Sequence, residues 1–365
     1  MSTQNKLRVA VIGCGMFATS QYLPNISREA DAETVAAVDI DFGRAEAAAR
    51  RFGIPNAYHD VYELVQKCDV DVAIDAASIQ AHDEINRAVL SAGKHLISQK
   101  PAAPDVERLN EQIRLAEENH VKFACAPIHP MRYDLNFAKR LIADGAIGRA
   151  YYLKCNMSHG GPEYFQYRDA DPSWFYEPGA GALVDMGVHG LQIVTSLFGP
   201  ASSVACTAII STPRREIRSG AYNGRYIDSD KLPDQYLITL KFPNERMALV
   251  DSGFSQKASR APQLEIFGDR GTIAFTKPYM TDPKPDVYID SGELGFRGWV
   301  TPDEWVDPPR RLTSQCCILR DLADAVAADT TPLLSAYHAR HVLEIMCKIP
   351  DAIQTGREQR LETVF

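Results

Sequence analysis

The chain has 365 residues, 45% of them hydrophobic, and carries a formal net charge of −8. A chain of this length is expected to form two domains, and its composition supplies ordinary hydrophobic cores, which excludes a disordered protein. The acidic balance argues against nucleic acid or an anionic membrane as the main partner.

The cysteines and the N-terminus favour a cytoplasmic protein without a structural metal. None of the eight cysteines is in C-x-x-C spacing, so the sequence predicts neither a zinc site nor a disulfide framework. The residues before Leu7 do not resemble a signal peptide. The longest stretch without acidic or basic residues, Met186–Pro213, contains polar residues and a Gly-Pro pair, so we expect no membrane span there.

A glycine-rich turn near the N-terminus predicts a dinucleotide site. Val9–Ile12 is a short apolar run typical of a buried strand, and helix-compatible sequence follows the glycines. Gly13 permits a tight turn, and Gly15 lets the backbone approach a pyrophosphate, which the helix N-terminus then binds. The residues that we expect around the cofactor at this turn are Gly13, Gly15, Met16, Phe17 and Ala18.

An acidic residue after the second apolar run favours NAD over NADP. Thr34–Val38 is followed by Asp39, about 20 residues beyond the glycines, where a carboxylate accepts hydrogen bonds from the adenosine ribose and repels a 2′-phosphate. Arg44 is expected near the same site and would soften this preference. The alternative is that Asp39 only caps the next helix, a role for which Asp41 is equally suited.

Alternating strands and helices predict a doubly wound parallel sheet in the first third of the chain. We expect helices over 42–52, 61–67, 82–92 and 106–119, and strands over 57–58, 70–76, 95–98 and 121–126. The predicted fold class is α/β. An N-terminal Rossmann dinucleotide-binding domain covers residues 1–127, and a C-terminal α+β domain covers residues 128–365.

Beyond residue 128 the strands lack intervening helices, which predicts a large, mostly antiparallel open sheet. The expected strands cover 150–157, 204–210, 234–242, 246–254, 263–267 and 272–275. Helices over 181–197, 316–328 and 336–354 are expected to cover one face of this sheet. Two long segments rich in Pro and Gly, 160–179 and 277–309, are interpreted as loops around a substrate pocket.

Gln99-Lys100-Pro101 follows the fifth predicted strand, at the sheet edge where ligands bind in open α/β folds. The proline disfavours helix at Lys100. An ammonium group there can hydrogen-bond a substrate oxygen and stabilise the charge that develops on it. The alternative is a solvated surface lysine, which is the commoner case.

Asp185 and His189 lie four residues apart in a predicted helix and therefore share a face. This spacing suits an acid–base pair in which the carboxylate tunes the imidazole. It also suits half of a metal site, but the sequence shows no third ligand, so we predict no metal. A surface ion pair or a core histidine is the simpler interpretation of these two residues alone.

Together these residues resemble the Gfo/Idh/MocA oxidoreductase family over nearly the whole chain. The matching segments, in order, are Gly13-x-Gly15-x-x-Ala18, Asp39, Gln99-Lys100-Pro101, Pro172-Ser173-Trp174-Phe175-Tyr176, Asp185-x-x-x-His189 and Phe267-Gly268-Asp269-x-Gly271-Thr272. The resemblance implies that Lys100, Asp185 and His189 are catalytic, and that Gln99 and Lys100 contact the cofactor. It also implies a homo-dimer or homo-tetramer assembled through the exposed face of the C-terminal sheet.

The resemblance implies a hydride transfer between NAD and a secondary alcohol or ketone of a sugar, cyclitol or glycoside. His189 is expected to take the hydroxyl proton, Lys100 to stabilise alkoxide character, and Asp185 to position these groups. Two alternatives are a glycoside-cleaving enzyme that recycles bound NAD and a non-catalytic dinucleotide-binding regulator. Retention of all three residues argues against the regulator. Gln99 replaces the family's usual glutamate, which removes a negative charge beside Lys100.

The expected substrate contacts combine hydrogen bonding with aromatic faces, since a polyhydroxylated ring presents both hydroxyls and apolar C–H surfaces. They are Arg132, Tyr133, Asn156, His159, Tyr164, Trp174 and Tyr176. Arg132 either binds a carboxylate, which makes a sugar acid an alternative substrate, or pairs with a nearby acidic residue. Core packing suits each of these residues equally well when it is taken singly.

Overall fold

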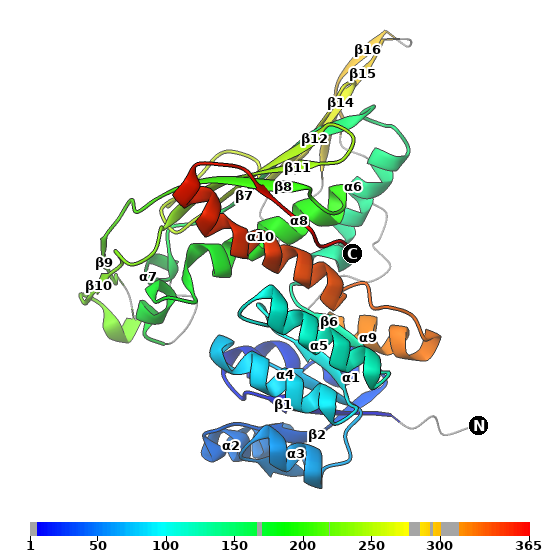
Figure 1. The fold of residues 1–365 in the computed structure, drawn as a ribbon, viewed down its shortest axis with the longest axis vertical. Helices are drawn as coiled ribbons and strands as arrows, with labels where there is room; N and C mark the ends of the chain where they lie inside the picture. Colours follow the sequence, from blue (N-terminus) through cyan, green and yellow to red (C-terminus); the bar gives the residue numbers. More distant parts are fainter. Residues whose placement is uncertain (1–5, 166–169, 219, 277–284, 293–294, 301–313) are drawn as a thin grey trace. The chain divides into compact units, whose positions relative to one another are not determined.

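The chain forms two compact units, whose elements are labelled in Figure 1. The computed structural model describes residues 6–365 except 166–169, 219, 277–284, 293–294 and 301–313. Met1–Ile128 and Leu312–Leu343 form the first unit, and His129–Arg311 and Glu344–Phe365 form the second. A single boundary near residue 127 is therefore not how the chain divides, because 312–343 returns to the first unit.

The first unit is built on a parallel sheet of six strands in the order β3-β2-β1-β4-β5-β6. The strands are β1 (Leu7–Ile12), β2 (Ala32–Val38), β3 (Asn56–Tyr58), β4 (Val72–Asp75), β5 (His95–Ser98) and β6 (Phe123–Cys125). The strand order reverses between β1 and β4, and ligands bind outside the carboxyl ends of strands at such a point. The predicted Rossmann sheet is confirmed.

Short helices connect these strands. They are α1 (Ile26–Glu29), α2 (Phe42–Phe52), α3 (Val61–Lys67), α4 (His82–Ser91) and α5 (Val106–Glu118), with the π-helix η1 (Ala18–Tyr22) after the glycine turn and the 3₁₀ turn η2 (Ile79–Ala81) before α4. In α2, the Asp41 side chain accepts a hydrogen bond from Gly43 N–H at the start, and Gly53 ends the helix with a φ of 67°. No helix in the described part of the chain has the length and apolar character needed to span a membrane.

Two C-terminal helices do not lie where we expected them. α9 (Cys317–Ala328) and the first part of α10 (Ala336–Thr355) belong to the first unit. α9 contacts α1, β5 and β6, and Ala336 and Leu343 of α10 join the hydrophobic core of that unit. The prediction that 316–328 covers the antiparallel sheet is wrong, because an apolar stripe shows that a helix is covered but does not identify its partner.

The second unit is built on a nine-stranded sheet in the order β16-β15-β14-β13-β7-β12-β11-β8-β17. The strands are β7 (Ala150–Ser158), β8 (Ser203–Ile209), β11 (Gln235–Phe242), β12 (Arg246–Gly253), β13 (Leu264–Gly268), β14 (Gly271–Phe275), β15 (Asp286–Ser291), β16 (Phe296–Val300) and β17 (Gln359–Arg360). In the described chain, β7 and β12 pair in parallel and the other neighbours pair antiparallel. The predicted, mostly antiparallel sheet is confirmed.

Helices α6 (Tyr133–Ala143) and α8 (Val188–Phe198) lie along one face of this sheet (Figure 1). α8 approaches closely, since a Cβ on Gly190 would lie 2.9 Å from Cγ of Met157 on β7. Successive side chains of a strand point to opposite faces, so Asn156 lies on the other, open face. There it is in register with Asp251 of β12, which is in register with the exposed Leu237 of β11.

Several elements lie where we expected loops or made no prediction. Segment 277–309 contains the β15–β16 hairpin, while 277–284 and 301–309 lie outside the described residues. β9 (Arg214–Glu216) and β10 (Tyr226–Asp228) form a separate two-stranded sheet. Segment 160–179 contains the short helices α7 (Pro162–Phe165) and η4 (Pro172–Tyr176). Both segments that we expected to be loops therefore contain helices or strands of the second unit.

Candidate active site

The glycine turn after β1 is shaped for a close backbone approach. Gly13 has a φ of +87°, and a Cβ built on it would lie 2.6 Å from both Cα and N of Ala77, which follows β4. A Cβ on Gly15 would have no other atom within 4 Å. The protein's own packing therefore requires Gly13, whereas Gly15 leaves space beside the first helical turn. A dinucleotide pyrophosphate needs such a space at a helix N-terminus.

Asp39 follows β2, and its buried carboxylate accepts bonds from three groups. Cys14 N–H donates to Oδ2 and Asp41 N–H donates to Oδ1, each at 2.9 Å. The exposed Arg44 places Nη2 3.0 Å from Oδ1. Burial and the charge of Asp39 raise the pKa of the Cys14 thiol to about 11, so this thiol is protonated. Asp41 caps α2, so Asp39 does more than cap that helix and lies beside the glycine turn, as a ribose contact requires.

A buried pair at the end of β4 supports the same turn. His82 Nδ1 lies 2.6 Å from Oδ2 of Asp75, and both residues are buried. Oδ1 of Asp75 accepts a hydrogen bond from Ala77 N–H at 3.0 Å. The pair thus fixes the loop that packs against Gly13. Sequence analysis did not identify it, because the strand pattern explains Asp75 as a strand end and His82 as a helix start.

Gln99 and Lys100 follow β5 at the same edge of the parallel sheet. Gln99 donates a side-chain hydrogen bond to the hydroxyl of Tyr22, which is fully buried. Phe17 packs edge to face on Tyr22 with ring centroids 5.8 Å apart, Met16 is exposed and Ala18 is buried. Lys100 is half-buried and precedes a cis peptide bond to Pro101. The side chain of Gln99 is therefore a neutral amide that is hydrogen-bonded to Tyr22. A glutamate at this position, as in the family that the chain resembles, would carry a negative charge.

In the second unit, His189 is hydrogen-bonded to a second histidine. His129 lies in the 3₁₀ turn η3 (His129–Met131), and its Nε2 lies 2.8 Å from Nδ1 of His189. On the other side of the His129 ring, Nη1 of Arg132 lies 3.3 Å from Nδ1. Arg132 is in turn paired with the carboxylate of Asp134 through two hydrogen bonds. Asp134, Arg132, His129 and His189 are thus joined by consecutive polar contacts.

His129 is buried, and burial determines its charge. Its pKa lies well below the ordinary value because of burial and, in addition, the charges of His189 and Arg132. Its backbone N–H donates to the Gln192 side chain on α8 at 3.3 Å. His129 is therefore a neutral, fixed imidazole. Sequence analysis missed it, although its spacing of three from Arg132 was a usable signal, because side chains three apart eclipse in a 3₁₀ turn.

Asp185 lies on a π-helical turn, η5 (Leu183–Gly187), that leads into α8, and not in the regular helix that we expected. Burial lowers the pKa of His159, and the charges of Asp185 and Glu163 oppose that shift. The structure therefore brings Asp185 close to His159 as well as to the helix that carries His189. Single π turns inside helices are frequent at functional sites.

His159 follows β7 and is held by its neighbours on several sides. Its ring stacks on Phe254 with centroids 5.2 Å apart and meets Phe165 edge to face at 5.6 Å. Gly161 N–H donates to Nδ1 at 2.9 Å. Because Nδ1 accepts this hydrogen bond, a neutral His159 carries its proton on Nε2.

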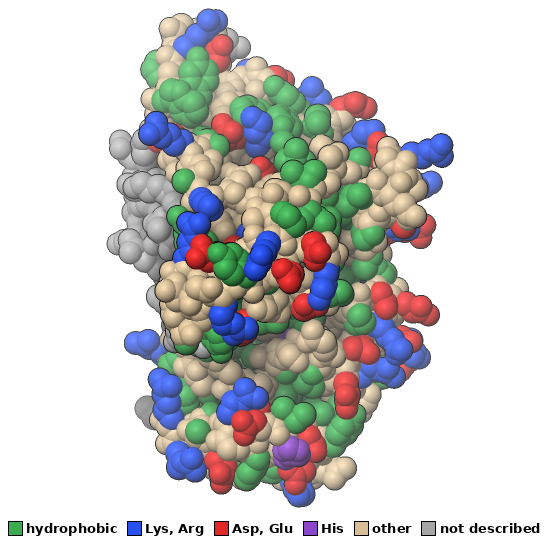
Figure 2. All heavy atoms as spheres, turned by 90° about the vertical axis from the view of Figure 1, so that its left-hand side faces the viewer, with side chains coloured by type: hydrophobic (Ala, Val, Ile, Leu, Met, Phe, Trp, Pro, Cys, Tyr) green, Lys and Arg blue, Asp and Glu red, His purple; other side chains and the backbone are tan. Residues whose placement is uncertain are grey.

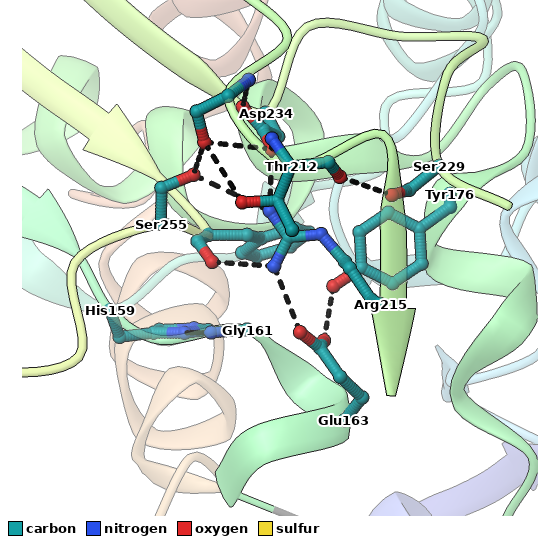
Figure 3. Close-up of polar contacts among 11 residues, drawn as sticks. His159, Gly161, Glu163, Tyr176, Thr212, Arg215, Ser229, Asp234 and Ser255 are labelled. Atoms are coloured by element: carbon teal, nitrogen blue, oxygen red, sulfur yellow. Dashed lines mark hydrogen bonds and ion pairs between the residues drawn. The ribbon is translucent and has the colours of Figure 1, made fainter. Parts of the chain in front are cut away.

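A buried arginine ties the loop after β7 to the small two-stranded sheet. Arg215 of β9 is 4% exposed, and Figure 3 shows its guanidinium between the carboxylates of Glu163 and Asp234. Nη1 donates to Glu163 Oε1 and to the carbonyl of Phe254, both at 2.8 Å. Burial alone would raise the pKa of Asp234, but hydrogen bonds from backbone N–H groups and from Arg215 hold it below its ordinary value. The cluster is therefore charged in the interior, where both terminal nitrogens of Arg215 are hydrogen-bonded, while its buried Nε has no hydrogen-bond partner among the described residues.

Tyr176, an expected substrate contact, belongs to this cluster. Its hydroxyl donates to Oε2 of Glu163 (Figure 3). Its ring packs against Phe254 with centroids 5.7 Å apart. Burial and the charge of Glu163 raise its pKa above the ordinary value. Trp174, two residues earlier, is exposed and stacks on Phe175. Tyr176 is therefore a buried residue that is bonded to Glu163, whereas the ring of Trp174 is exposed.

The remaining expected pocket residues lie in different places. Arg132 is engaged by Asp134, which is the second of the two roles that we considered for it. Tyr133 stacks on Phe137 within α6, and Tyr164 meets Phe165 edge to face at the surface. Asn156 lies on the open face of the sheet, so the structure does not bring it to the α8 face. Across the described residues, no three His, Cys, Asp or Glu side chains are grouped as metal ligands.

Two stretches of the chain match known families. Residues 7–126 match the oxidoreductase family with an NAD-binding Rossmann fold, and residues 135–274 match the Gfo/Idh/MocA C-terminal domain. The chain belongs to the Gfo/Idh/MocA oxidoreductase family. As in that family, its N-terminal Rossmann unit binds NAD, and the open space at Gly15 and the carboxylate of Asp39 fit that cofactor.

Several Gfo/Idh/MocA relatives are dehydrogenases by name. Levoglucosan dehydrogenase from Pseudarthrobacter phenanthrenivorans is 29% identical over 275 residues, which cover 70% of this chain and 68% of that protein. scyllo-Inositol 2-dehydrogenase (NAD(+)) from Bacillus subtilis is 23% identical over 366 residues, covering 98% and 97%. myo-Inositol 2-dehydrogenase from Thermotoga maritima is 22% identical over 302 residues, covering 80% of each.

Several solved structures share the fold over nearly the whole chain. Levoglucosan dehydrogenase in complex with NADH has a TM-score of 0.82 at 22% identity, covering 99% of this chain and 100% of that one. Aldose-aldose oxidoreductase from Caulobacter crescentus has a TM-score of 0.77 at 19% identity, covering 98% and 100%. At these identities the likeness establishes the arrangement of strands and helices.

Proposed function

We propose that this protein is an NAD-dependent dehydrogenase that moves a hydride between the nicotinamide and a secondary alcohol or ketone of a sugar, cyclitol or glycoside. The chain of bonds that fixes His189 is the observation that carries the proposal. An imidazole held in a fixed orientation is suited to align a hydroxyl for hydride transfer. The relatives named for levoglucosan and inositol support a ring hydroxyl as the reacting group.

Each residue has a defined task in this proposal. NAD, when bound, takes up or returns the hydride. Gly15 and Asp39 bind its pyrophosphate and adenosine ribose, and Asp39 favours NAD over NADP. The ammonium group of Lys100 stabilises negative charge on the substrate oxygen. His189 takes the hydroxyl proton during oxidation, and Asp185 positions these groups.

The test is a spectroscopic screen for turnover. Purified protein with NAD, and in parallel with NADP, is mixed with cyclitols, aldoses, glycosides and sugar acids, and the NADH band is followed. We expect NADH from one class with NAD. Cleavage of a glycoside without net NADH, by protein that retains dinucleotide through purification, would replace the proposal with the cofactor-recycling reaction. Binding of NAD without any turnover would favour a regulator.

We also propose that the protein is a homo-dimer or homo-tetramer joined through the open face of the nine-stranded sheet. Leu237 and Met247 on this face are each 46% exposed, and Ile209 is 56% exposed. The view in Figure 2 shows hydrophobic side chains gathered towards the end where β15 and β16 lie, and Phe296 and Trp299 of β16 are exposed. Apolar patches of this kind mark protein interfaces. Light scattering should give a multiple of 40.4 kDa, and Leu237→Lys should lower it.

We propose a cytoplasmic location. None of the eight cysteines forms a disulfide, and several of them are buried in the folded units. Free thiols are typical of a reducing compartment. Cell fractionation with a tagged full-length chain tests this location.

A further inference from the structure

Two amide side chains are buried between helices of the first unit. Asn86 of α4 and Gln112 of α5 are fully buried, on the faces where amphipathic helices usually carry apolar residues. The two helices contact each other, and α4 also contacts β5 (Figure 1). Burial of an amide costs free energy unless its polar atoms are hydrogen-bonded. The bonds that these amides make therefore show what they hold in place.

Asn86 bridges the two ends of the segment that carries Lys100. Its Nδ2 donates to Oγ of Ser98 at 3.0 Å and to the carbonyl of Ala102 at 2.9 Å. A carbonyl can only accept, so the NH₂ group of Asn86 must face Ala102. Oδ1 of Asn86 is buried and has no hydrogen-bond partner among the described residues, so the amide is placed for its donors. Lys100 is the middle residue of the bridged segment 98–102.

Gln112 holds the far end of the same segment. Its Nε2 donates to the carbonyl of Ala102 at 3.2 Å and to Oδ1 of Asp83, in the first turn of α4, at 2.9 Å. Its Oε1 lies 3.3 Å from Nδ2 of Asn86, which is longer than either bond from Asn86 to the segment. The two amides therefore bind segment 98–102 more closely than they bind each other.

The near end of the segment is also fixed through its backbone. Gln99 N–H donates to the carbonyl of Asp75, at the end of β4, at 3.0 Å. The carbonyl of Gln99 accepts from Oγ of Ser98 at 3.0 Å. Both polar backbone groups of the residue before Lys100 are thus bonded. On the other side of Lys100, the two buried amides hold the chain at Ala102.

We propose that Asn86 and Gln112 are positioning residues that fix the backbone of Lys100, and with it the point from which the ammonium group reaches the substrate oxygen. The proposal rests on the role of Lys100 in the dehydrogenase function proposed above. Both amides are fully buried, so they act through segment 98–102 and not on the substrate. A lysine stem is flexible, and displacement of a reacting group by about 1 Å costs about 100-fold in rate.

Nitrogen NMR of ¹⁵N-lysine-labelled, full-length protein tests the positioning without turnover. The backbone signal of Lys100 is assigned with Lys100→Arg. Asn86→Leu and Gln112→Met fill a similar space without the donors, and we expect both to shift this signal. Asn86→Leu should shift it more, because it loses bonds at both ends of the segment. Leu64→Ala, which removes core packing at α3, should lower the melting temperature and leave the signal in place.

A Lys100 signal that stays in place in both amide variants would overturn the proposal, whether or not a substrate has been found. If Asn86→Leu does not fold, Gln112→Met decides alone, because it keeps the bonds from Asn86 to the segment. Failure to find any substrate would instead count against the dehydrogenase function alone.

A double-mutant cycle on the substrate identified by the turnover screen tests whether the amides act through Lys100. We expect kcat to fall about 100-fold in Asn86→Leu and about tenfold in Gln112→Met, with NADH affinity preserved. In Lys100→Ala protein, the same substitutions should lower kcat less than about twofold, because the group that they position is gone. Asn110→Ala, at an exposed amide of α5, should behave like the unaltered protein. Equal falls with and without Lys100 would show that the amides only stabilise the fold.

Discussion

The guanidinium of Arg215 lies over the ring of Tyr176, 5.1 Å from its centroid, and both side chains are bonded to the same carboxylate, that of Glu163. Arg215 comes from the small two-stranded sheet, whereas Tyr176 and Glu163 come from the segment after β7. The same arginine donates to the carbonyl of Phe254, on which His159 stacks. Arg215 thus holds in place both Tyr176, an expected substrate contact, and the Glu163 carboxylate to which Tyr176 is bonded.

Arg215→Met should destabilise the second unit and raise KM for the substrate. Removing one member of a buried ion pair leaves uncompensated carboxylates and costs about 3–5 kcal/mol. Arg225→Ala is the matched control, because Arg225 forms an exposed pair with Asp171 at 3.1 Å, and exposed pairs contribute about 0–1 kcal/mol. Thermal melting and KM are the measurements. Equal melting temperatures for the two variants would contradict a supporting role for Arg215.

Gly13 and Gly15 should respond differently to alanine. Gly13→Ala places a Cβ against Ala77 at a positive φ, so both the melting temperature and the affinity for NADH should fall. Gly15→Ala meets no protein atom and should keep its melting temperature, but it fills the space assigned to the pyrophosphate, so NADH should bind at least tenfold more weakly. Fluorescence titration with NADH measures both. Unaltered NADH binding by Gly15→Ala would place the pyrophosphate elsewhere.

The buried pair of Asp75 and His82 should matter for both stability and cofactor binding. His82→Leu leaves the Asp75 carboxylate without its imidazole partner and loosens the loop that packs against Gly13. Losing a partner of a buried charged group costs about 3 kcal/mol. We therefore expect a lower melting temperature and weaker NADH binding, whereas His120→Asn at the surface, where asparagine tolerates the φ of 55°, should alter neither. A variant that loses stability but keeps full NADH affinity would separate this loop from the cofactor site.

Asp39→Ala should weaken NAD binding and relax the discrimination against NADP. The carboxylate that repels a 2′-phosphate is removed, and Arg44, which is paired with it, becomes available to a phosphate. The ratio of kcat/KM for NAD and NADP should shift by about tenfold or more towards NADP. Asp41→Ala removes a neighbouring carboxylate and the cap of α2, and should leave the ratio nearly unchanged. An unaltered ratio in Asp39→Ala would contradict the ribose contact.

Most strands and helices of the two units were predicted because each has a sequence pattern that is visible within a short segment. The glycine turn, the alternation of apolar runs with helices, and the period of two beyond residue 150 are each visible within about ten residues of sequence. The partners of apolar stripes are not visible in that way, so α9 was assigned to the wrong sheet. The β15–β16 hairpin was missed because Pro and Gly dominate the segment around it.

The sequence named candidate residues of the site but not the groups that hold them in place. Lys100, Asp185 and His189 followed from the family resemblance, but their supporting groups did not. Arg215 sits in Arg214-Arg215-Glu216, which has the composition of an exposed strand, and only the alternation of exposed and buried positions places its guanidinium inside. The base role expected for His189 is implied by the family resemblance, whereas the bonds to His129 and Arg132 that hold its ring were not predicted.

We infer that this chain transfers a hydride between NAD and a ring hydroxyl with the help of Lys100 and His189. The most direct measurement is NADH absorbance with NAD and a panel of cyclitols and sugars, for the unaltered protein, Lys100→Ala and His189→Ala together. We predict NADH with one substrate class, and rates at least about 100-fold lower in both variants with NADH affinity preserved. Turnover that is equally fast in all three proteins, or NAD binding with no oxidation of any ring hydroxyl, would contradict the claim.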